Sequence, residues 1–338
     1  MTAAAPKSLA RARELVTPVL AAAAATLSPE LRRVVEYHWG WVDADGRPLA
    51  GAAGKMLRPT LVTLSAEAVG APAARAGAAA AAVELIHDFT LLHDDVMDGD
   101  RERRHRATAW TVFGVGGAIC AGDALVLLAQ RVLLEDPSET RVPALLALND
   151  ATAAVIAGQM LDLSFEGRLD VSLGRYLAMS AGKTGALLAG AASLGAILAG
   201  GPREAVRELH AFGAALGLAF QAVDDWLGIW GKPERTGKPF ASDLRQKKSS
   251  LPIVFALAES GAAADALRAL VAGDALADES SLARGVELLG ACGAERRTRE
   301  EAERQVAAAR AALARAPIEP AAREELEELA SFVVEREF

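Results

Sequence analysis

Apolar residues recur at helical spacing along most of this chain of 338 residues. Runs that alternate apolar and polar residues, which are typical of strands, are missing between the helical stretches. The pattern therefore predicts one all-α domain spanning residues 1–338. Its interruptions are too short for domain linkers: "DADGRPLAGAAG" (43–54), "EGRLD" (166–170), "AGGP" (199–202), "GKPERTGKPFAS" (231–242) and "LLGACGA" (288–294).

The composition favours the same fold class. Hydrophobic residues make up 52% of the chain and aromatic residues only 5%, and the abundance of Ala and Leu favours helices over strands. The stretch from Arg296 to Phe338 is rich in Ala, Glu and Arg. It predicts exposed amphipathic helices with ion pairs at i,i+4 spacing.

One apolar segment, residues 184–202, carries no charge and just reaches the length of a membrane-spanning helix. It is rich in Gly and Ala and ends at a GGP break, so a buried helix close to its neighbours is the favoured interpretation. We therefore do not expect an integral membrane protein. The first apolar stretch contains Glu14 and Pro18, which is not typical of a signal peptide.

Charge and cysteine content narrow the function classes. A net charge of −8 argues against general nucleic-acid binding, which needs clustered cations. Cys120 and Cys292 have neither the spacing of metal ligands nor that of a disulfide framework. We expect a cytoplasmic protein in which both cysteines are small core residues.

The segment "LLHDDVMDGDRERR" (91–104) collects charge of both signs beside strongly apolar sequence. On a helix, His87, Asp94 and Asp98 fall on one face, because spacings of seven and four residues nearly restore the same direction. Asp95 lies next to them. Carboxylates this close raise one another's pKa unless a cation lies between them, so a bound cation is the favoured interpretation.

A second acidic segment, "FQAVDDWLG" (220–228), echoes the first. Gln221, Asp224 and Asp225 stand at i, i+3 and i+4 and share one side of a helix. Mg²⁺ is usually bound by one or two carboxylates plus phosphate oxygens of a substrate. The two segments together suggest metal ions that hold a diphosphate. Capping aspartates with surface arginines would explain either segment alone.

Basic residues are scattered at loops rather than gathered in runs. Lys183 stands in the middle of an apolar helical stretch, which is costly unless its ammonium meets an anion. Several such residues beside two acidic segments suggest more than one diphosphate. They occur in "GKMLRP" (54–59), "AGKTGA" (181–186) and "TGKPFASDLRQKKSSLP" (236–252).

In their order and spacing, these motifs resemble the all-trans isoprenyl diphosphate synthases, the polyprenyl synthetase family that includes farnesyl and geranylgeranyl diphosphate synthases. The resemblance implies a bundle of long antiparallel helices around a central apolar cavity, a homodimer, and Mg²⁺ as cofactor, with about three ions once diphosphate is bound. The implied reaction joins isopentenyl diphosphate to an allylic diphosphate of C5 to C15.

The resemblance also implies a role for each motif residue. The isopentenyl diphosphate site would consist of Lys55, Arg58, His87 and Arg104. The metal-binding residues would be Asp94, Asp98 and Asp224, with Asp95 and Asp225 beside them. The allylic diphosphate would be held by Arg103, Lys183 and Lys238, and Arg103 and Arg104 would make bidentate contacts. Thr184 and Gln221 would lie beside the reacting carbons, and Lys248 matches the lysine of the family's "DLxxxKxTLP" segment.

The sequence departs from the family pattern in two motifs. Gly228 stands where the last aspartate of the second motif usually stands, and because that residue is the least directly involved of the three, we expect activity to survive. "RRHRAT" replaces the commoner "RRGxPT", with His105 and Ala107 at the changed positions. Both arginines of this loop are retained.

Two residues before the first motif bear on product length. Phe89 stands five positions before Asp94 and Thr90 four before it, which resembles geranylgeranyl synthases (C20) more than farnesyl synthases (C15). Helix geometry places Thr90 near Asp94 in direction but Phe89 about 140° away. Phe89 is therefore predicted either to cap the cavity or to be a core residue that faces a neighbouring helix.

Three alternatives remain open from the sequence. A class I terpene cyclase shares an aspartate-rich motif, but would not need the basic residues of a second diphosphate site and usually has more aromatic residues. A noncatalytic partner subunit would be expected to have lost the first motif, which is intact here. A helical scaffold with incidental charges is the third, and an absence of Mg²⁺-dependent diphosphate binding would favour it.

Overall fold

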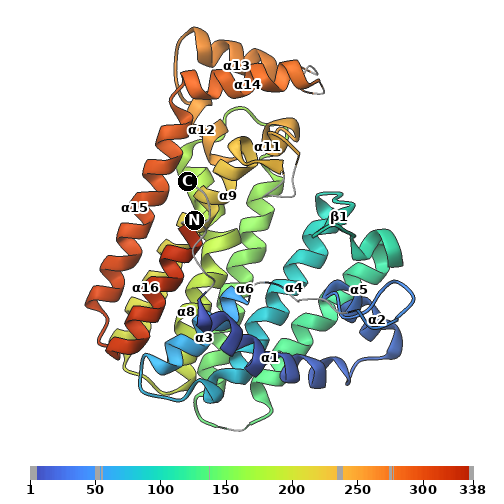
Figure 1. Cartoon of the computed structure of the whole chain (residues 1–338), viewed down its shortest axis with the longest axis vertical. Coiled ribbons are helices and arrows are strands. Elements are labelled where there is room, and N and C mark those ends of the chain that lie inside the picture. Colours follow the sequence, from blue (N-terminus) through green and yellow to red (C-terminus); the bar gives the residue numbers. More distant parts are fainter. Residues whose placement is uncertain are drawn as a thin grey trace. The chain divides into compact units, whose positions relative to one another are not determined.

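The computed structural model describes residues 6–49, 54, 56–136, 138–233, 239–273, 276 and 278–334, and nearly all of its regular structure is helical (Figure 1). The predicted all-α class is confirmed. The contacts divide the chain into two compact units, which are described separately. The first unit comprises Met1–Thr152, Gly190–His210 and Arg315–Leu329, and the second comprises Ala153–Ala189, Ala211–Ala314 and Ala330–Phe338.

Most of the predicted breaks lie between helices, but the break predicted at 288–294 is shorter in the structure, because α14 continues to Ala291 and α15 begins at Ala294. The first unit contains α1 (Lys7–Ala24), α2 (Pro29–His38), α3 (Leu57–Glu67), η1 (Ala73–Ala76), α4 (Gly77–Met97), β1 (Glu102–Arg103), β2 (Arg106–Ala107) and α5 (Ala109–Leu134). The second contains α7 (Leu173–Ser180), η2 (Ala181–Gly185), α11 (Ser242–Arg245), α12 (Leu251–Leu257), α13 (Ala262–Ala272) and α14 (Glu279–Ala291). Helices with residues in both units are α6 (Arg141–Leu163), α8 (Ala186–Leu198), α9 (Arg203–Trp230), α15 (Ala294–Arg315) and α16 (Pro320–Val334).

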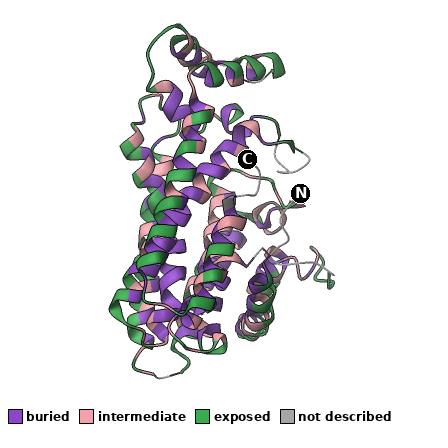
Figure 2. Cartoon of the chain, turned by 60° about the vertical axis from the view of Figure 1, so that its left-hand side comes forward, coloured by how far each residue is buried: buried purple, intermediate pink, exposed green. Residues whose placement is uncertain are grey.

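Helix α4 is the centre of the first unit, where it contacts α1, α3 and α5. From Ala79 to Leu85 most of its residues are buried all round, as expected of a helix enclosed by others. Elsewhere the helices carry a buried stripe beside an exposed one (Figure 2). Because α4 ends at Met97, the surrounding helices fix the position of the first aspartate motif.

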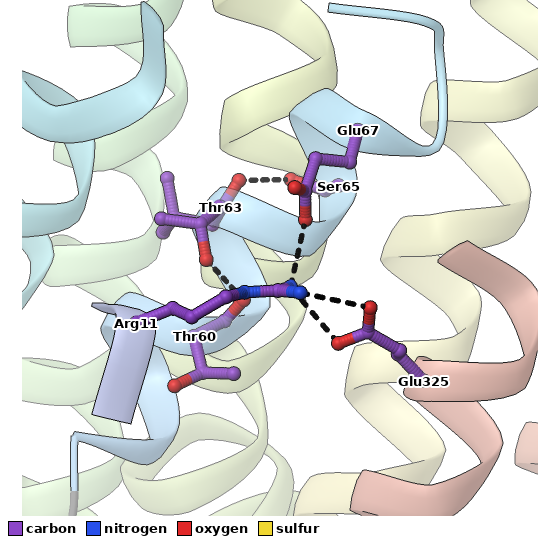
Figure 3. A network of polar contacts seen from close by, with 7 residues as sticks. Arg11, Thr60, Thr63, Ser65, Glu67 and Glu325 are labelled. Carbon is purple, nitrogen blue, oxygen red and sulfur yellow. Dashed lines mark hydrogen bonds and ion pairs between the residues drawn. The ribbon is translucent and has the colours of Figure 1, made fainter. Parts of the chain in front are cut away.

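A polar network joins three helices of the first unit (Figure 3). Arg11 of α1 forms ion pairs with Glu67 of α3, at 3.3 Å, and with Glu325 of α16, at 2.9 Å. The arginine is half exposed, so these pairs add only modest stability. Closer packing comes from Gly195 of α8, because an ideal Cβ built there would overlap the Val62 carbonyl oxygen and lie 2.5 Å from Ser65 Oγ.

The second unit has its own hydrophobic core, in which side chains of α7, α11, α12, α13 and α14 meet. Its largest fully buried side chains include Phe165 and Tyr176. Arg296 pairs with Glu300 and Glu295 with Arg299 at i,i+4 spacing on α15, so the predicted ion pairs of this stretch are confirmed. The same helix also buries a face.

Three expectations from the sequence need correction. Cys120 is exposed and Cys292 half-buried, so the prediction of two core cysteines is wrong. A short antiparallel pair, β1 and β2, occurs where only helix and loop were expected. Within the described residues, three helical stretches, not one, reach membrane-spanning length and apolarity: Ala109–Leu134, Arg141–Leu163 and Leu173–Leu198. Burial inside the protein is most extensive for the last of them.

We expect Gly195→Ala to lower the free energy of unfolding by about 3 kcal/mol, because the added methyl group overlaps the α3 backbone. Gly290→Ala, at a helical position with nothing within 4 Å of the added carbon, should instead raise stability by about 0.5 kcal/mol. Thermal unfolding of both variants measures the difference. Equal midpoints would show that α3 and α8 are not in close contact.

Candidate active site

The first aspartate motif lies at the C-terminal end of α4. Asp94 and Asp95 stand in its last turn and Asp98 is its C-cap residue. Asp94 is half-buried and Asp98 is exposed. The C-terminal end of a helix carries partial negative charge, so carboxylates there are unfavourable unless a cation is near. The placement of the motif therefore favours the binding of a cation.

The Asp95 carboxylate is bound by Arg103. It is 1% exposed, and its Oδ1 accepts a hydrogen bond from Arg103 Nε at 2.8 Å and forms an ion pair with Nη2 at 2.7 Å. Its Oδ2 has no hydrogen-bond partner among the residues that the structure describes. Burial raises the pKa of this carboxyl, although the Arg103 contacts oppose the shift. The contact ties β1 to α4 and leaves one buried oxygen able to accept a further bond.

Arg104 is presented by a strained turn. The pair β1–β2 is joined by Arg104 and His105, whose φ angles are +53° and +60°. These values are typical of a type I′ turn, which favours Asn and Gly. On β2, Arg106 donates to the carbonyl oxygens of Tyr37 at 3.1 Å and Val42 at 3.0 Å. The hairpin is therefore held at both strands while its turn residues adopt an unfavourable conformation.

Three residues predicted to bind isopentenyl diphosphate lie in the first unit: Arg58, His87 and Arg104. The two arginines influence the pKa of the histidine. Burial, followed by the charges of Arg58 and Arg104, lowers the pKa of His87 well below its usual value. His87 is thus neutral at physiological pH and can donate one hydrogen bond. Arg58 Nε is buried without a hydrogen-bond partner in the described part of the chain. A buried guanidinium N–H without a hydrogen-bond partner, close to a second arginine, favours an anionic ligand.

Two buried acids lie next to these cations, and sequence reasoning missed both. Glu84 and Asp88 of α4 are 6% and 5% exposed. Burial and the neighbouring Asp88 raise the pKa of Glu84 to about 8, while Arg58 and Arg104 oppose that shift. Asp88 Oδ2 accepts a hydrogen bond from Trp39 Nε1 at 2.7 Å. The sequence held a signal for Glu84, which stands in a largely apolar helical stretch three positions before His87.

The loop before α3 is held in the same region. Arg13 of α1 donates from Nη2 to the Gly54 carbonyl at 2.8 Å. An ideal Cβ at Gly54 would lie 3.0 Å from Arg104 Nη2, so the glycine allows the guanidinium to approach the backbone. The "GKMLRP" and "RR" motifs therefore meet in the first unit. Lys55 itself lies outside the described residues.

A cavity of about 270 Å³ opens beside this hairpin in the first unit. The side chains that line it include His38, Trp39, Asp95, Arg103, Arg104 and Arg106. His38 Nε2 is buried and has no hydrogen-bond partner among the described residues. The cavity thus combines cationic and aromatic walls with one buried donor or acceptor.

Phe89 is a buried residue of α4 that packs against His93 of the same helix. Its ring meets the imidazole of His93 edge to face, with centroids 4.8 Å apart. His93 Nε2 in turn lies 3.1 Å from the Ile119 carbonyl oxygen of α5, and an ideal Cβ at Gly122 would overlap the imidazole. Thr90 donates to the His87 carbonyl at 2.7 Å and is half-buried.

In the second unit, close backbone packing positions Lys183 and Thr184. Both lie in η2, a π-helical segment, and such segments are frequent at functional sites. An ideal Cβ at Gly217 of α9 would lie 2.6 Å from Gly185 Cα, and one at Gly158 of α6 would overlap the η2 backbone. Glycines at these positions let three helical segments approach closely.

The ammonium of Lys183 meets an anion, as its apolar surroundings require. Its Nζ lies 2.6 Å from Asp162 Oδ2 of α6, and both side chains are partly exposed. Sequence reasoning missed Asp162, because the contact joins residues 21 positions apart on different helices.

A chain of hydrogen bonds runs from Thr184 to the second aspartate motif. Thr184 Oγ1 donates to Gln221 Oε1 at 2.5 Å, and Gln221 Nε2 donates to Asp225 Oδ1 at 2.7 Å. Asp225 Oδ2 also accepts from Tyr176 Oη and from the Leu251 backbone N–H, each at 2.6 Å. Asp225 is therefore a buried support, and the half-buried Asp224 beside it remains accessible from the surface of α9.

Burial and the charge of Asp243 raise the pKa of Asp225 to about 7, although the three donors oppose the shift. Lys248 follows α11, and its backbone N–H donates to the Asp243 carbonyl at 2.9 Å. Lys238 lies outside the described residues. Within the part of the chain that is described, no group of three His, Cys, Asp or Glu side chains is arranged to hold a metal ion alone.

Comparisons with known proteins all point to one family. The polyprenyl synthetase profile matches residues 41–289. The (2E,6E)-farnesyl diphosphate synthase of Mycobacterium tuberculosis is 45% identical over 97% of this chain and 92% of its own length. The geranylgeranyl diphosphate synthase of the same organism is 42% identical over 90% of this chain and 87% of its own.

Solved structures agree with the sequence relatives. A polyprenyl synthetase from Streptomyces coelicolor A3(2) superimposes with a TM-score of 0.93 at 46% identity, covering 97% of this chain and 99% of that one. A geranylgeranyl pyrophosphate synthase from Corynebacterium glutamicum, solved with isoprenyl diphosphate and magnesium, has a TM-score of 0.83 at 27% identity, covering 99% of this chain and 100% of that one. The chain belongs to the polyprenyl synthetase family and is a prenyltransferase.

Proposed function

We propose that the protein catalyses the Mg²⁺-dependent head-to-tail condensation of isopentenyl diphosphate with allylic diphosphates to give a short-chain all-trans prenyl diphosphate. The observation that carries the proposal is that a neighbouring side chain supports one buried aspartate of each motif, Arg103 on Asp95 and Tyr176 on Asp225. Both supports hold the middle aspartate and leave its neighbours at the helix surface. A terpene cyclase, a noncatalytic subunit and a scaffold are not favoured by the relatives.

We assign Asp94, Asp98 and Asp224 as the metal ligands, with Asp95 and Asp225 as residues that orient them. Oxygen donors of this kind suit Mg²⁺, and the absence of a complete cluster within the described residues agrees with an ion that also needs diphosphate oxygens and water. The buried Asp95 Oδ2, which has no hydrogen-bond partner among the described residues, is a further acceptor in the first motif. The magnesium in the Corynebacterium relative supports this choice. When bound, about three Mg²⁺ ions would neutralise charge on the leaving diphosphate.

The isopentenyl diphosphate would bind through Arg58, Arg104 and Lys55, with His87 donating a hydrogen bond from its neutral ring. The Asp88 carboxylate lies near Arg58 and offsets part of its charge before the diphosphate arrives, whereas Glu84, with a pKa of about 8, keeps its proton. The allylic diphosphate would bind through Arg103, Lys183 and Lys238. Asp162, which pairs with Lys183 in this structure, would have to give way to the more highly charged diphosphate.

In the reaction, the C1–O bond of the allylic substrate breaks and its electron pair leaves with the diphosphate. The isopentenyl double bond then attacks C1, and the proton lost from C2 of the isopentenyl unit passes to an oxygen of the released diphosphate. Thr184 and Gln221 would orient the reacting carbons, because their shared hydrogen bond fixes the amide. Apolar surroundings keep water from the carbocation.

We propose geranylgeranyl diphosphate (C20) as the main product, with farnesyl diphosphate (C15) as the second candidate. The reason is Phe89, a buried aromatic residue in the turn of α4 before the first motif, next to the smaller Thr90. The relatives include synthases of both products and so do not separate the two lengths.

We also propose that the protein works in the cytoplasm as a homodimer. Several large apolar side chains on α5 and α6 are exposed, including Leu127 at 68% and Met160 at 63%. Exposed apolar side chains in such number indicate an interface. Charged, exposed residues among them, Asp123 and Arg131 on α5 and Asp150 on α6, favour a second copy of the chain over lipid.

We expect Asp94→Ala and Asp224→Ala each to lower kcat by roughly a thousandfold or more, since each removes a ligand needed as charge develops on the diphosphate. Thermal unfolding should change little. Asp265→Ala, which removes an exposed carboxylate of α13, serves as the control. Wild-type turnover in either motif variant would contradict the metal assignment.

Phe89→Ala should shift the products toward chains longer than C20, which product sizing by chromatography would detect. Leu92→Ala, a truncation of another buried α4 residue, should leave the distribution unchanged. If a folded Phe89→Ala protein makes wild-type products, Phe89 is an ordinary core residue and the cavity ends elsewhere.

Size-exclusion chromatography with light scattering should give a dimer for the wild-type protein. A Leu127→Glu variant should shift toward the monomer, because a charge is buried at the interface. Leu49→Glu, at another exposed apolar side chain, should remain dimeric. A wild-type monomer, or a dimer unaffected by Leu127→Glu, would rule out this interface.

Glu84 predicts a pH effect on stability. Its pKa is about 8 in the fold against 4.5 for an ordinary glutamate, so the folded protein keeps a proton that the unfolded chain releases within this range. Stability therefore falls as the pH rises from about 4.5 to 8. Between pH 6 and 8, wild type should lose about 2 kcal/mol relative to Glu84→Gln in urea unfolding. Glu287→Gln, an exposed control, should run parallel to wild type.

A further inference from the structure

The hairpin after the first aspartate motif lacks the two residues that would favour its turn. In "RRHRAT", His105 stands where the commoner family pattern has glycine, and Ala107 where it has proline. Arg104 and His105 nevertheless adopt positive φ angles, +53° and +60°. Glycine adopts such angles readily, whereas other residues lose free energy by doing so. Strands of two residues offset little of this loss, because an isolated short hairpin is only marginally stable.

Arg106 of β2 attaches the hairpin to another element. Its guanidinium donates to the carbonyl oxygens of Tyr37, at 3.1 Å, and Val42, at 3.0 Å. It also lies over the Tyr37 ring, 4.4 Å from the centroid. Tyr37 is in the last turn of α2, where the final carbonyls of a helix carry partial negative charge. The arginine therefore caps α2 from outside, and its positive charge strengthens both hydrogen bonds.

The end of α2 is shaped to receive this arginine. Gly40 follows the helix with a φ of +76°, and an ideal Cβ there would lie 3.1 Å from Arg106 Nη1, so a side chain would crowd the guanidinium. The buried Tyr37 donates from Oη to the Ala107 carbonyl oxygen at 2.8 Å. The attachment thus runs in both directions, since Arg106 binds the α2 backbone and Tyr37 binds the β2 backbone.

Arg104 depends on this attachment more than its neighbour does. Arg103 is bound by Asp95 of α4, a contact that does not involve α2. Arg104 is exposed in the turn itself, so the backbone conformation of the turn sets the direction of its side chain. In this conformation its charge is close enough to His87 to lower the pKa of that ring. A turn that relaxed to negative φ angles would point Arg104 elsewhere.

We propose that Arg106 is a positioning residue for the binding of isopentenyl diphosphate. By binding the end of α2, it holds the turn in the conformation that presents Arg104, a conformation that the glycine of the commoner pattern would adopt unaided. Arg106 acts through Arg104 rather than on the substrate. The inference rests on the proposed function, which assigns Arg104 to the isopentenyl diphosphate.

The test removes the attachment and then restores the turn by another route. Arg106→Met deletes the guanidinium, and Arg106→Lys leaves a single charged nitrogen in place of the planar fork. His105→Gly supplies the residue that suits the turn, alone and in the double variant Arg106→Met/His105→Gly. Arg33→Met is the matched control, because Arg33 also donates to a carbonyl of the loop after α2, that of Ala44, and lies over a ring, Phe113. Both of these contacts are outside the hairpin.

Steady-state kinetics with Mg²⁺, isopentenyl diphosphate and a C10 allylic diphosphate give kcat and both KM values, and thermal unfolding reports folding. We expect Arg106→Met to raise KM for isopentenyl diphosphate about tenfold, while kcat and the allylic KM stay within about threefold of wild type. Arg106→Lys should lie between the two. The double variant should return to within about threefold of wild type, because glycine holds the turn without the attachment.

His105→Gly alone and Arg33→Met should match wild type. A general loss of folded protein would lower the apparent kcat without raising one KM selectively, and a glycine in the turn would not correct it. The selective change in KM and its rescue therefore separate a positioning role from a structural one.

A wild-type KM for isopentenyl diphosphate in folded Arg106→Met protein would overturn the proposal. An equal rise in both KM values, or a double variant no better than Arg106→Met, would overturn it too. If Arg106→Met does not fold, Arg106→Lys decides, and a wild-type KM there counts against the proposal. If the wild-type protein itself condenses no substrates, the proposed function fails first, and that result is distinct from a failure limited to Arg106.

Discussion

Charged side chains buried in an Ala- and Leu-rich helical protein must be compensated, and the functional residues of this chain are arranged by that constraint. Asp95 accepts a hydrogen bond from Arg103 and forms an ion pair with it, Lys183 pairs with Asp162, and Asp225 accepts hydrogen bonds from three donors. Leaving the buried Asp95 or Asp225 without a partner would cost several kcal/mol, whereas the partly exposed Lys183–Asp162 pair contributes less. Each compensated charge also fixes a neighbouring side chain, so that the pairing that makes burial tolerable also sets the geometry of the site.

Glycine residues also shape the site, because they let two backbones approach where a side chain would keep them apart. Gly158 and Gly217 set the distance of α6 and α9 from η2, and Gly54 brings the loop before α3 next to Arg104. The π-helical segment that carries Lys183 can therefore sit within reach of Gln221 and Asp162. The positions of the functional side chains therefore depend on small residues at helix contacts as much as on the polar groups themselves.

Much of the fold was accessible from the sequence, because helical periodicity, turn residues and paired aspartates are local signals. Most breaks fell between helices, although the one predicted at 288–294 overlaps the end of α14, and the family followed from motifs at fixed spacing. The β1–β2 hairpin was missed because two-residue strands leave no alternating pattern. Glu84, Asp162 and Tyr176 were missed because their partners are defined only by long-range packing. The cysteines were misjudged because residue type predicts burial only on average.

The hairpin after the first motif has a consequence for how the two substrates communicate. Arg103 and Arg104 are adjacent in the chain, one held by Asp95 on α4 and the other at the tip of a strained turn. If they serve different diphosphates, as assigned, the turn cannot shift for one substrate without moving the anchor of the other. Binding of one diphosphate then changes the affinity for the other diphosphate. By thermodynamic linkage, this coupling is equal in both directions. A residue that touches neither substrate, such as Asp95, would change the cooperativity between them.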